Sequence, residues 1–247
     1  MARPGSIGHP RTLWLIRHAE SAGNVANAAA LAGGLPELDL AHRDMDVPLS
    51  ERGVAQARAL GTWVDGLDEL PEVIWSSPYV RALDTARLAL ETSGKHVPIV
   101  ADERLREREF GVLDRLTKVG IEARHPEQAA ARAFLGKFYH RPPGGESWAD
   151  VVARVRSVLT SLRLDHAGER VCIVAHQAVI TLCRYVLEGL DEAEVLALDR
   201  AEDIANTAVT TYRGDGHNVP LLVSANDTSH LPSDLRTDDP DRPVAPR

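Results

Sequence analysis

The stretch Thr12-Leu-Trp-Leu-Ile-Arg-His-Ala-Glu-Ser-Ala-Gly-Asn24 decides the fold of this chain of 247 residues. Its first five residues form an apolar run that stops at Arg17 and His18, which is how a buried strand delivers polar side chains to the edge of a sheet. Two later runs end in the same way, Val73-Ile-Trp75 before Ser76 and Val171-Cys-Ile-Val-Ala175 before His176. Because ligands of open α/β sheets bind at the carboxyl ends of strands, these three ends predict one shared pocket.

Helical patterns separate the predicted strands. Ser50 is placed to cap a helix whose apolar residues recur every three or four positions as far as Val64, and residues 81–90 repeat the pattern before Gly94. Ser147-Trp-Ala-Asp150 resembles a capping box that opens a third helix, which runs through Leu162. Strand and helix therefore alternate, and this alternation predicts an α/β fold.

One domain covering residues 1–230 is expected, because chains of about 200 to 250 residues often form a single α/β domain. Residues 208–212 and 220–224 are predicted to form a late pair of strands around a turn-rich segment. Residues 25–45 and 116–143 are predicted to form helical cap elements over the pocket. The segment 231–247 is dense in proline, aspartate and arginine, and we expect it to be a mobile tail.

Composition narrows the class of partner. The net charge of −8 argues against a nucleic-acid partner, since phosphate backbones are held by clustered lysine and arginine. The first residues do not resemble a signal peptide and no apolar run is long enough to span a membrane, so a cytoplasmic enzyme without a membrane partner is expected. Cys172 and Cys183 lack the spacing of a metal site and are predicted to be buried reduced thiols.

Residues 17–24 carry the chemistry that the pocket needs. Arg17 provides a planar guanidinium fork that matches phosphate oxygens, and Asn24 can donate two further hydrogen bonds. Ser21 is predicted to be a hydrogen-bonding accessory rather than a nucleophile. The neutral imidazole of His18 can attack phosphorus while the two other groups hold the phosphoryl oxygens. The segment therefore predicts a phosphate site with a histidine nucleophile.

This strand and its motif resemble the histidine phosphatase superfamily, also called phosphoglycerate mutase-like, whose hallmark is Arg-His-Gly at the end of the first strand. Ala19 stands where the family has its glycine. Four later segments match the family in its order, namely Asp46-Val-Pro-Leu-Ser-Glu-Arg-Gly53, Ser76-Ser-Pro-Tyr-Val-Arg81, Leu105-Arg-Glu-Arg-Glu-Phe-Gly111 and Ala175-His-Gln-Ala-Val179. The resemblance covers roughly residues 12–225. It implies a three-layer α/β/α fold with a mostly parallel sheet and a small helical cap.

The resemblance also implies a role for each matched residue. His18 becomes the residue that is transiently phosphorylated, and Glu107 matches the family's proton donor. Arg17, Arg81 and a protonated His176 would neutralise the phosphoryl oxygens in a loose, in-line transition state. This chemistry requires neither a metal nor another cofactor. Homodimers occur in the family, so a homodimer is one expected assembly.

Several other charged residues are given a structural interpretation. Arg106, Arg108 and Glu109 are predicted to be loop or solvent-facing groups. The histidines outside the matched motifs are predicted to lie on the surface or in loops unless one lines the cap, and they are His125, His140, His166, His217 and His230.

Two segments, Lys137-Phe-Tyr-His-Arg141 before Gly145-Glu-Ser147 and His176-Gln-Ala-Val179, are similar to the fructose-2,6-bisphosphatase branch of the family. That similarity makes Arg141 and Gln177 candidate substrate contacts, whereas Gly144 replaces a phosphate-binding lysine of that branch. We therefore expect a phosphatase that acts on a small phosphorylated metabolite, with a sugar bisphosphate as one candidate. Cofactor-dependent phosphoglycerate mutase activity and a catalytically inactive phosphate-binding protein are the two alternatives.

Overall fold

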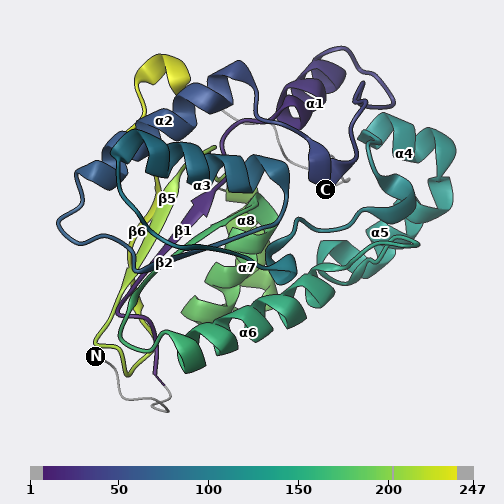
Figure 1. The fold of residues 1–247 in the computed structure, drawn as a ribbon. Coiled ribbons are helices and arrows are strands. Elements are labelled where there is room, and N and C mark those ends of the chain that lie inside the picture. Colours follow the sequence, from purple (N-terminus) through teal and green to yellow (C-terminus); the bar gives the residue numbers. More distant parts are fainter. Residues whose placement is uncertain (1–7, 202, 238–247) are drawn as a thin grey trace.

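A six-stranded sheet forms the centre of the structure, a computed structural model that describes residues 8–201 and 203–237 (Figure 1). Its strands are β1 (Thr12–Arg17), β2 (Val73–Ser76), β3 (Ile99–Ala101), β4 (Arg170–Ala175), β5 (Val209–Arg213) and β6 (Leu221–Asp227). The helices are α1 (Ala22–Ala32), α2 (Glu51–Asp65), α3 (Val80–Ser93), α4 (Lys118–Arg124), α5 (Pro126–Tyr139), α6 (Trp148–Asp165), α7 (Gln177–Glu188) and α8 (Glu192–Ala201). Every predicted strand is present, and β3 is a short strand that the sequence pattern did not predict.

The strand order brings the predicted strand ends together. The order is β3-β2-β4-β1-β5-β6, in which the first four strands run parallel and β5 is antiparallel to both of its neighbours. Arg17 pairs with Ala175 and Ser76 pairs with Val174. The residues that follow β1, β2 and β4 therefore leave the sheet at one edge, as the sequence predicted.

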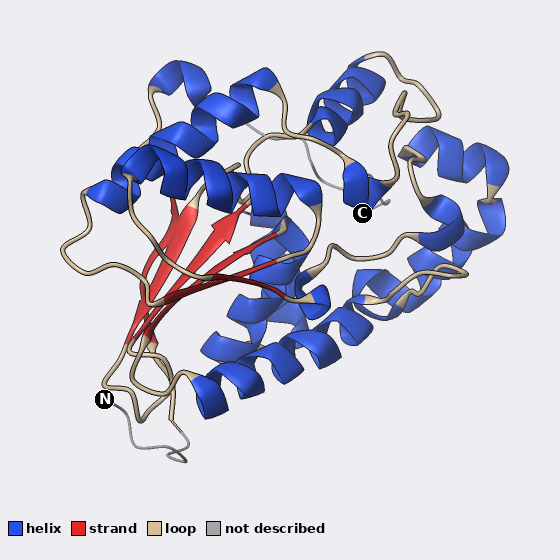
Figure 2. Cartoon of the chain, viewed as in Figure 1, coloured by secondary structure: helices blue, strands red, loops and turns tan. Residues whose placement is uncertain are grey.

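Two apolar cores hold the layers together, one on each face of the sheet. Along β1, Leu13 and Leu15 pack with α6, α7 and α8, whereas Trp14 and Ile16 pack with α2 and α3. The pleat of a strand explains this alternation, because it directs successive side chains to opposite faces. Helices cover both faces of the sheet (Figure 2), and the predicted three-layer α/β/α fold with a mostly parallel sheet is confirmed.

The predicted helix starts are confirmed as well. Ser50 Oγ accepts a hydrogen bond from the backbone N–H of Gly53 at 3.0 Å, and the Ser147–Asp150 capping box is complete. A Cβ atom on Gly53 would lie 1.9 Å from the carbonyl oxygen of Glu20. Only glycine allows α2 to pack this closely against the loop after β1, and that contact fixes the segment that carries the predicted phosphate site.

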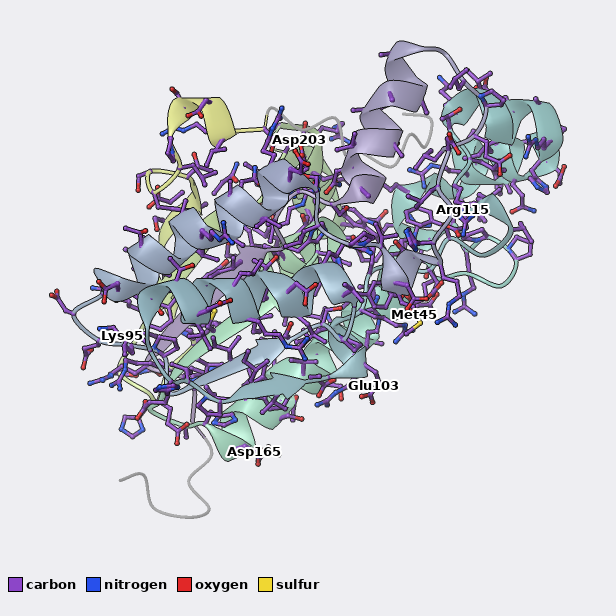
Figure 3. All side chains as sticks on the ribbon, turned by 45° about the horizontal axis from the view of Figure 1, so that its top comes forward. Met45, Lys95, Glu103, Arg115, Asp165 and Asp203 are labelled. Atoms are coloured by element: carbon purple, nitrogen blue, oxygen red, sulfur yellow. The ribbon has the colours of Figure 1, made fainter. Side chains whose placement is uncertain are left out.

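The two segments predicted as cap elements contact each other. Glu37 pairs with Leu116 in an isolated antiparallel bridge, and Thr117 Oγ1 donates to the carbonyl oxygen of Leu35 at 2.6 Å. A Cβ atom on Gly120 in α4 would lie 1.9 Å from the carbonyl oxygen of Pro36. Figure 3 shows Arg115 beside the cap helices, with Lys95 at the opposite end of the molecule.

The packed part of the domain extends beyond the predicted start of the tail at residue 231. Leu231 is 3% exposed, and Gln56 Nε2 donates to the carbonyl oxygen of Leu235 at 2.8 Å. Apolar burial and this buried amide therefore hold the chain against α2 as far as residue 235, and Thr237 Oγ1 donates to Asn206 Oδ1 at 3.1 Å. The remainder of the predicted tail, 238–247, lies outside the described residues.

No helix in the part of the chain that the structure describes is long and apolar enough to cross a membrane. The 18-residue α6 carries arginine and aspartate side chains along its length.

Candidate active site

A pocket with a volume of ≈180 Å³ lies between the carboxyl ends of the strands and the cap. The predicted site residues that line it are His18, Ser21, Asn24, Arg81, Glu107 and Gln177. Arg17 and His176 are fully buried next to it. Arg141 is the one predicted site residue that the structure places elsewhere.

His18 has the geometry that a nucleophilic imidazole needs. The backbone N–H of His18 donates to the carbonyl oxygen of Ala175 at 2.9 Å. The carbonyl oxygen of His18 accepts a hydrogen bond from Asn206 Nδ2 at 2.9 Å. Its Nδ1 donates to the carbonyl oxygen of Ala19 at 2.8 Å, which leaves the lone pair on Nε2. Ala19 substitutes for glycine without strain, because its φ angle is not positive.

The second histidine lies against the first. His176 follows β4, and the centroids of the His176 and His18 rings are 5.0 Å apart. Ser77, which follows β2, places its Oγ 2.8 Å from His176 Nε2. The other ring nitrogen, Nδ1, is buried without a hydrogen-bond partner among residues 8–201 and 203–237, and lies 3.9 Å from Glu107 Oε2. Three adjacent strands thus each deliver one group to the site.

Both imidazoles are held neutral. Burial lowers the pKa of His18 well below its ordinary value, and the positive charges of Arg81 and Arg17 lower it further. Burial and Arg81 have the same effect on the pKa of His176. A neutral His18 is the form that can attack phosphorus. The predicted protonated His176 is not supported, because its surroundings favour the neutral ring.

The two predicted arginines are used differently. Arg17 is fully buried, and its Nη1 donates to the carbonyl oxygen of Ile204 at 2.6 Å. Arg81 lines the pocket, and its guanidinium lies over the ring of Tyr79 at 5.0 Å from the centroid. Its Nη1 is 3.0 Å from Asp44 Oδ1, so the guanidinium already forms a salt bridge with the Asp44 carboxylate. Sequence reasoning did not predict this contact of Asp44.

Glu107, the predicted proton donor, lines the pocket beside His176. Its carboxyl group accepts a hydrogen bond from the backbone N–H of Arg108 at 2.8 Å. Burial raises the pKa of Glu107 above its ordinary value, although that hydrogen bond and Arg81 oppose the shift. The carboxyl group therefore keeps its proton to higher pH than an exposed glutamate does, as a general acid requires.

Ser21 and Asn24 form a capping box at the start of α1. Ser21 Oγ accepts from the backbone N–H of Asn24 at 3.2 Å, and Asn24 Oδ1 accepts from the backbone N–H of Ser21 at 2.9 Å. Both side chains also line the pocket. The amide oxygen of Asn24 is thus used to fix the start of the helix.

The two contacts suggested by the fructose-2,6-bisphosphatase branch differ in position. Gln177 is 7% exposed, lines the pocket, and has an Oε1 atom without a hydrogen-bond partner in the described part of the chain. Arg141 is exposed and pairs through its Nε with Asp150 Oδ2 at 2.7 Å, next to the cap of α6. Arg141 is therefore occupied outside the pocket, and the prediction that it binds substrate is not supported.

The cap contributes cations that the sequence interpretation missed. Arg108, predicted to be a loop or solvent-facing group, lies in a loop but is 4% exposed and lines the pocket, so the solvent-facing interpretation is wrong. His140 is 2% exposed and lines the pocket, which is the exception that the sequence interpretation allowed for a histidine at the cap. Arg132 and Lys137 line it as well. Arg132 follows Gln128 by four residues in an alanine-rich helix, a spacing that places both on one face. That spacing was the available signal.

Neither cysteines nor acidic clusters indicate another chemistry. Cys172 and Cys183 are buried free thiols, as predicted, and burial raises the pKa of each to about 12. No group of three or more histidine, cysteine or acidic side chains within residues 8–201 and 203–237 is arranged to hold a metal ion.

Comparison with known proteins gives two related activities. A 2,3-bisphosphoglycerate-dependent phosphoglycerate mutase of Methylobacterium radiotolerans is 38% identical over 188 residues, which cover 75% of this chain and 82% of the mutase. A 6-phosphofructo-2-kinase/fructose-2,6-bisphosphatase of Aquarana catesbeiana is 32% identical over 185 residues, which cover 74% of this chain and 34% of that longer protein.

Solved structures agree with the sequence comparisons. A mycobacterial glucosyl-3-phosphoglycerate phosphatase in complex with inorganic phosphate superposes with a TM-score of 0.67 at 28% identity, covering 90% of this chain and all of the other. A family profile, the histidine phosphatase superfamily (branch 1), matches residues 13–228. With the paired histidines, the arginines and the glutamate in place at one sheet edge, this chain belongs to the histidine phosphatase superfamily.

Proposed function

We propose that this protein is a phosphatase that hydrolyses a phosphomonoester of a small metabolite through a phosphohistidine on His18. The observation that carries the proposal is the buried, neutral imidazole whose Nδ1 donates to the carbonyl oxygen of Ala19 at 2.8 Å, in a pocket that Arg81 and Glu107 also line. Such a ring has its Nε2 lone pair available and its tautomer fixed.

In the first step, the Nε2 lone pair attacks phosphorus, and a P–N bond forms as the bond to the leaving oxygen breaks. Glu107 gives its proton to that oxygen, which departs as an alcohol. A guanidinium about 4 Å from the phosphoryl oxygens contributes about 4 kcal/mol at an effective dielectric constant of about 20, before desolvation costs. Arg81 is placed for this role.

His176 stabilises the same oxygens as a neutral donor. The Ser77 hydroxyl donates to Nε2 of His176 across 2.8 Å, so that Nδ1 carries the ring proton. This Nδ1 has no hydrogen-bond partner within the described residues and can donate to a phosphoryl oxygen.

In the second step, water attacks phosphorus and the carboxylate of Glu107 takes a proton from it. The P–N bond breaks, its electron pair returns to Nε2 of His18, and inorganic phosphate leaves. Each group ends in the protonation state in which it started, and no metal or other cofactor takes part in either step.

The groups around the pocket favour a hydroxylated metabolite. The unpartnered Oε1 of Gln177 can accept from a substrate hydroxyl. The similarity to a glucosyl-3-phosphoglycerate phosphatase supports water as the acceptor.

Mutase activity is the second candidate, because a relative that is 38% identical is a phosphoglycerate mutase. Incubation with 3-phosphoglycerate and a 2,3-bisphosphoglycerate primer separates the two. We expect release of phosphate to exceed isomerisation. Rapid isomerisation with negligible phosphate release would assign the mutase reaction instead.

Trapping the intermediate tests the proposal directly. Wild-type protein quenched in alkali during turnover of a radiolabelled phosphomonoester should carry acid-labile label on His18. We expect His18→Ala to lose at least about 10⁴-fold in kcat, since the nucleophile is removed. Turnover retained in His18→Ala, with no acid-labile label on the wild type, would overturn the proposal.

The same assay addresses an inactive phosphate-binding protein. We expect hydrolysis of p-nitrophenyl phosphate in the presence of a chelator between about pH 5 and 8, the range in which histidine chemistry operates. A folded protein that binds inorganic phosphate without turnover in this range would be a binding protein.

A further inference from the structure

The tautomer of His18 depends on the position of one backbone oxygen. That atom is the carbonyl oxygen of Ala19, which accepts a hydrogen bond from Nδ1 of His18 at 2.8 Å. It belongs to the peptide plane between Ala19 and Glu20, because the atoms of a peptide bond are coplanar. The other polar group of this plane, the N–H of Glu20, donates to Oε1 of Gln56 on α2 at 2.8 Å. The contact that holds the N–H therefore also holds the oxygen that faces Nδ1.

Both ends of the Gln56 amide are in use. The side chain is fully buried, and its Nε2 donates to the carbonyl oxygen of Leu235 at 2.8 Å. Since a carbonyl oxygen can only accept, this bond turns Nε2 toward Leu235 and leaves Oε1 for Glu20. Ser233–Leu235 lies beside α2 (Figure 1), so this late turn of the chain sets the orientation of the amide.

The preceding peptide plane, between His18 and Ala19, is also held at both of its polar groups. Its carbonyl oxygen accepts from Asn206 Nδ2 at 2.9 Å, and its N–H donates to Thr85 Oγ1 at 2.9 Å. The three side chains that contact the two planes, Gln56, Thr85 and Asn206, are each 0% exposed. Rotation of either plane would leave a buried polar group without a partner, which is unfavourable. The backbone on both sides of Ala19 is therefore fixed from outside the pocket.

We propose that Gln56, together with Thr85, is a positioning residue for the nucleophile. By holding the planes on either side of Ala19, these side chains keep its carbonyl oxygen on Nδ1 of His18 and thereby keep the lone pair on Nε2. Neither side chain lines the pocket, so both act through the backbone and not on the substrate. The inference rests on the proposed phosphatase function, which makes His18 the nucleophile, but the tautomer that it specifies can be measured without turnover.

NMR of the histidine rings tests the proposal. Isotope labelling of histidine nitrogens distinguishes the two neutral tautomers through the couplings between ring protons and ring nitrogens, and the signals of His18 are those missing from His18→Ala. In the wild type without substrate, we expect the Nδ1-protonated form. Gln56→Met has a similar length but removes both hydrogen bonds. It should shift the tautomer ratio by about 3- to 10-fold toward the Nε2-protonated form, as for the loss of one hydrogen bond.

Kinetics should show the same loss in the chemical step and not in binding. In a single turnover of p-nitrophenyl phosphate, the rate of phosphohistidine formation should fall by about 3- to 10-fold in Gln56→Met. The Kd for inorganic phosphate should change by less than about twofold, because a typical hydrogen bond to the ligand is worth more than this. Gln56→Glu keeps an oxygen for the N–H of Glu20, and it should recover most of the lost rate.

Two further variants separate positioning from a general loss of stability. Tyr212→Phe removes the hydrogen bond from the Tyr212 hydroxyl to Glu188 Oε1 at 2.6 Å, on β5 and α7. It should unfold at lower urea concentration than the wild type while the tautomer ratio and the rate stay unchanged. Thr85→Val keeps the shape of the side chain but removes the acceptor for the N–H of Ala19. It should shift the tautomer in the same direction as Gln56→Met, and it provides the test if Gln56→Met does not fold.

The outcomes distinguish this inference from the proposed function. An Nε2-protonated His18 in the wild type, or an unchanged tautomer ratio in the folded variants of Gln56 and Thr85, would overturn the inference. Equal losses of rate in Gln56→Met and Tyr212→Phe would also overturn it, because stability alone would then explain the effect. A shifted tautomer in Gln56→Met, with no phosphohistidine trapped on the wild type, would support the positioning of His18 and count against the phosphatase.

Discussion

The pocket has a strand end, where residues follow β1, β2 and β4, and a cap end, where residues of α5 line it, and these two ends are built in different ways. At the strand end, His18, Ser77 and His176 each follow one of three adjacent parallel strands, so the register of the sheet sets their separation. At the cap end, Arg132 and Lys137 come from α5, which packs against α4, α6 and α8. The comparison teaches that the groups proposed to react are fixed by the sheet, whereas the groups at the other end of the pocket are fixed by the cap.

The two ends also differ in how their charges are paired. Arg17 and Arg81 are engaged by a backbone carbonyl and by Asp44, whereas Arg132 has no hydrogen-bond partner in the described part of the chain. Changes at the strand end should therefore affect every phosphomonoester. Changes at the cap end should alter the ratio between substrates.

The largest of the remaining effects is expected for Glu107→Gln. The substitution removes the general acid, so kcat for butyl phosphate should fall by about 100- to 10⁴-fold. The fall should be smaller for p-nitrophenyl phosphate, because its leaving group departs without a proton. Steady-state kinetics on both substrates provide the measurement, and equal losses would contradict the role of proton donor.

The pH dependence of kcat/KM tests the protonation states assigned to His18 and Glu107. Wild-type kcat/KM should rise with pH as His18 loses its proton, at a pH below the ordinary imidazole pKa because that pKa is lowered. It should fall as Glu107 loses its proton, at a pH above the ordinary carboxyl pKa because that pKa is raised. Dividing the wild-type profile by that of Glu107→Gln cancels the titration of the substrate, and a ratio that does not fall with rising pH would contradict the assignment.

An intermediate effect is expected for Gly120→Ala, at the point where the two cap segments contact each other. Gly120→Ala would place a Cβ atom 1.9 Å from the carbonyl oxygen of Pro36, so the two cap segments must separate. We expect the free energy of unfolding to fall by about 1–3 kcal/mol, as for other overpacked sites.

The control for this variant is Gly66→Ala. Gly66 has a φ of −80°, and an added Cβ atom would lie 3.6 Å from the carbonyl oxygen of Trp63, an ordinary contact distance. Urea unfolding of both proteins compares the two sites. A free energy of unfolding that is unchanged in Gly120→Ala would show that the two cap segments do not need this close contact.

The smallest effect is expected for Asp44→Asn, and it is a gain. The Asp44 carboxylate lies 3.0 Å from Arg81 Nη1 and competes with the phosphoryl group for that cation. Removing its charge should lower KM by about fivefold for every substrate, which corresponds to about 1 kcal/mol for one exposed charge at close range.

Asp46→Asn is the matched control for that gain. Asp46 belongs to the same 3₁₀ turn but pairs with Arg43 at 2.6 Å, away from Arg81. Its KM should match that of the wild type. A higher KM in Asp44→Asn would mean that Asp44 positions Arg81 rather than competing with substrate.

The strand end of the site could be predicted because its signals are local. An apolar run that stops at a polar residue identifies both a strand and its functional end, and this holds for His18 and His176. The protonation state of His176 could not be predicted in this way. It depends on burial and on Arg81, which lies almost a hundred residues earlier in the chain.

The cap end could not be predicted because its residues have ordinary surroundings in the sequence. Arg108 and His140 lie in polar stretches, where surface exposure is the usual outcome, yet both are buried in the pocket. Arg141 shows the reverse. A motif suggested that Arg141 contacts the substrate, but its guanidinium pairs with Asp150 on α6.

The sequence by itself determined the α/β fold, the helix caps at Ser50 and Ser147, and the nature of the reacting groups, because each of these follows from patterns within a few residues. The tertiary structure alone decided which cations share the pocket and which of them lack partners. Charge pairing and burial depend on segments that meet only after folding, such as α5 over the sheet edge and residues 231–235 against α2.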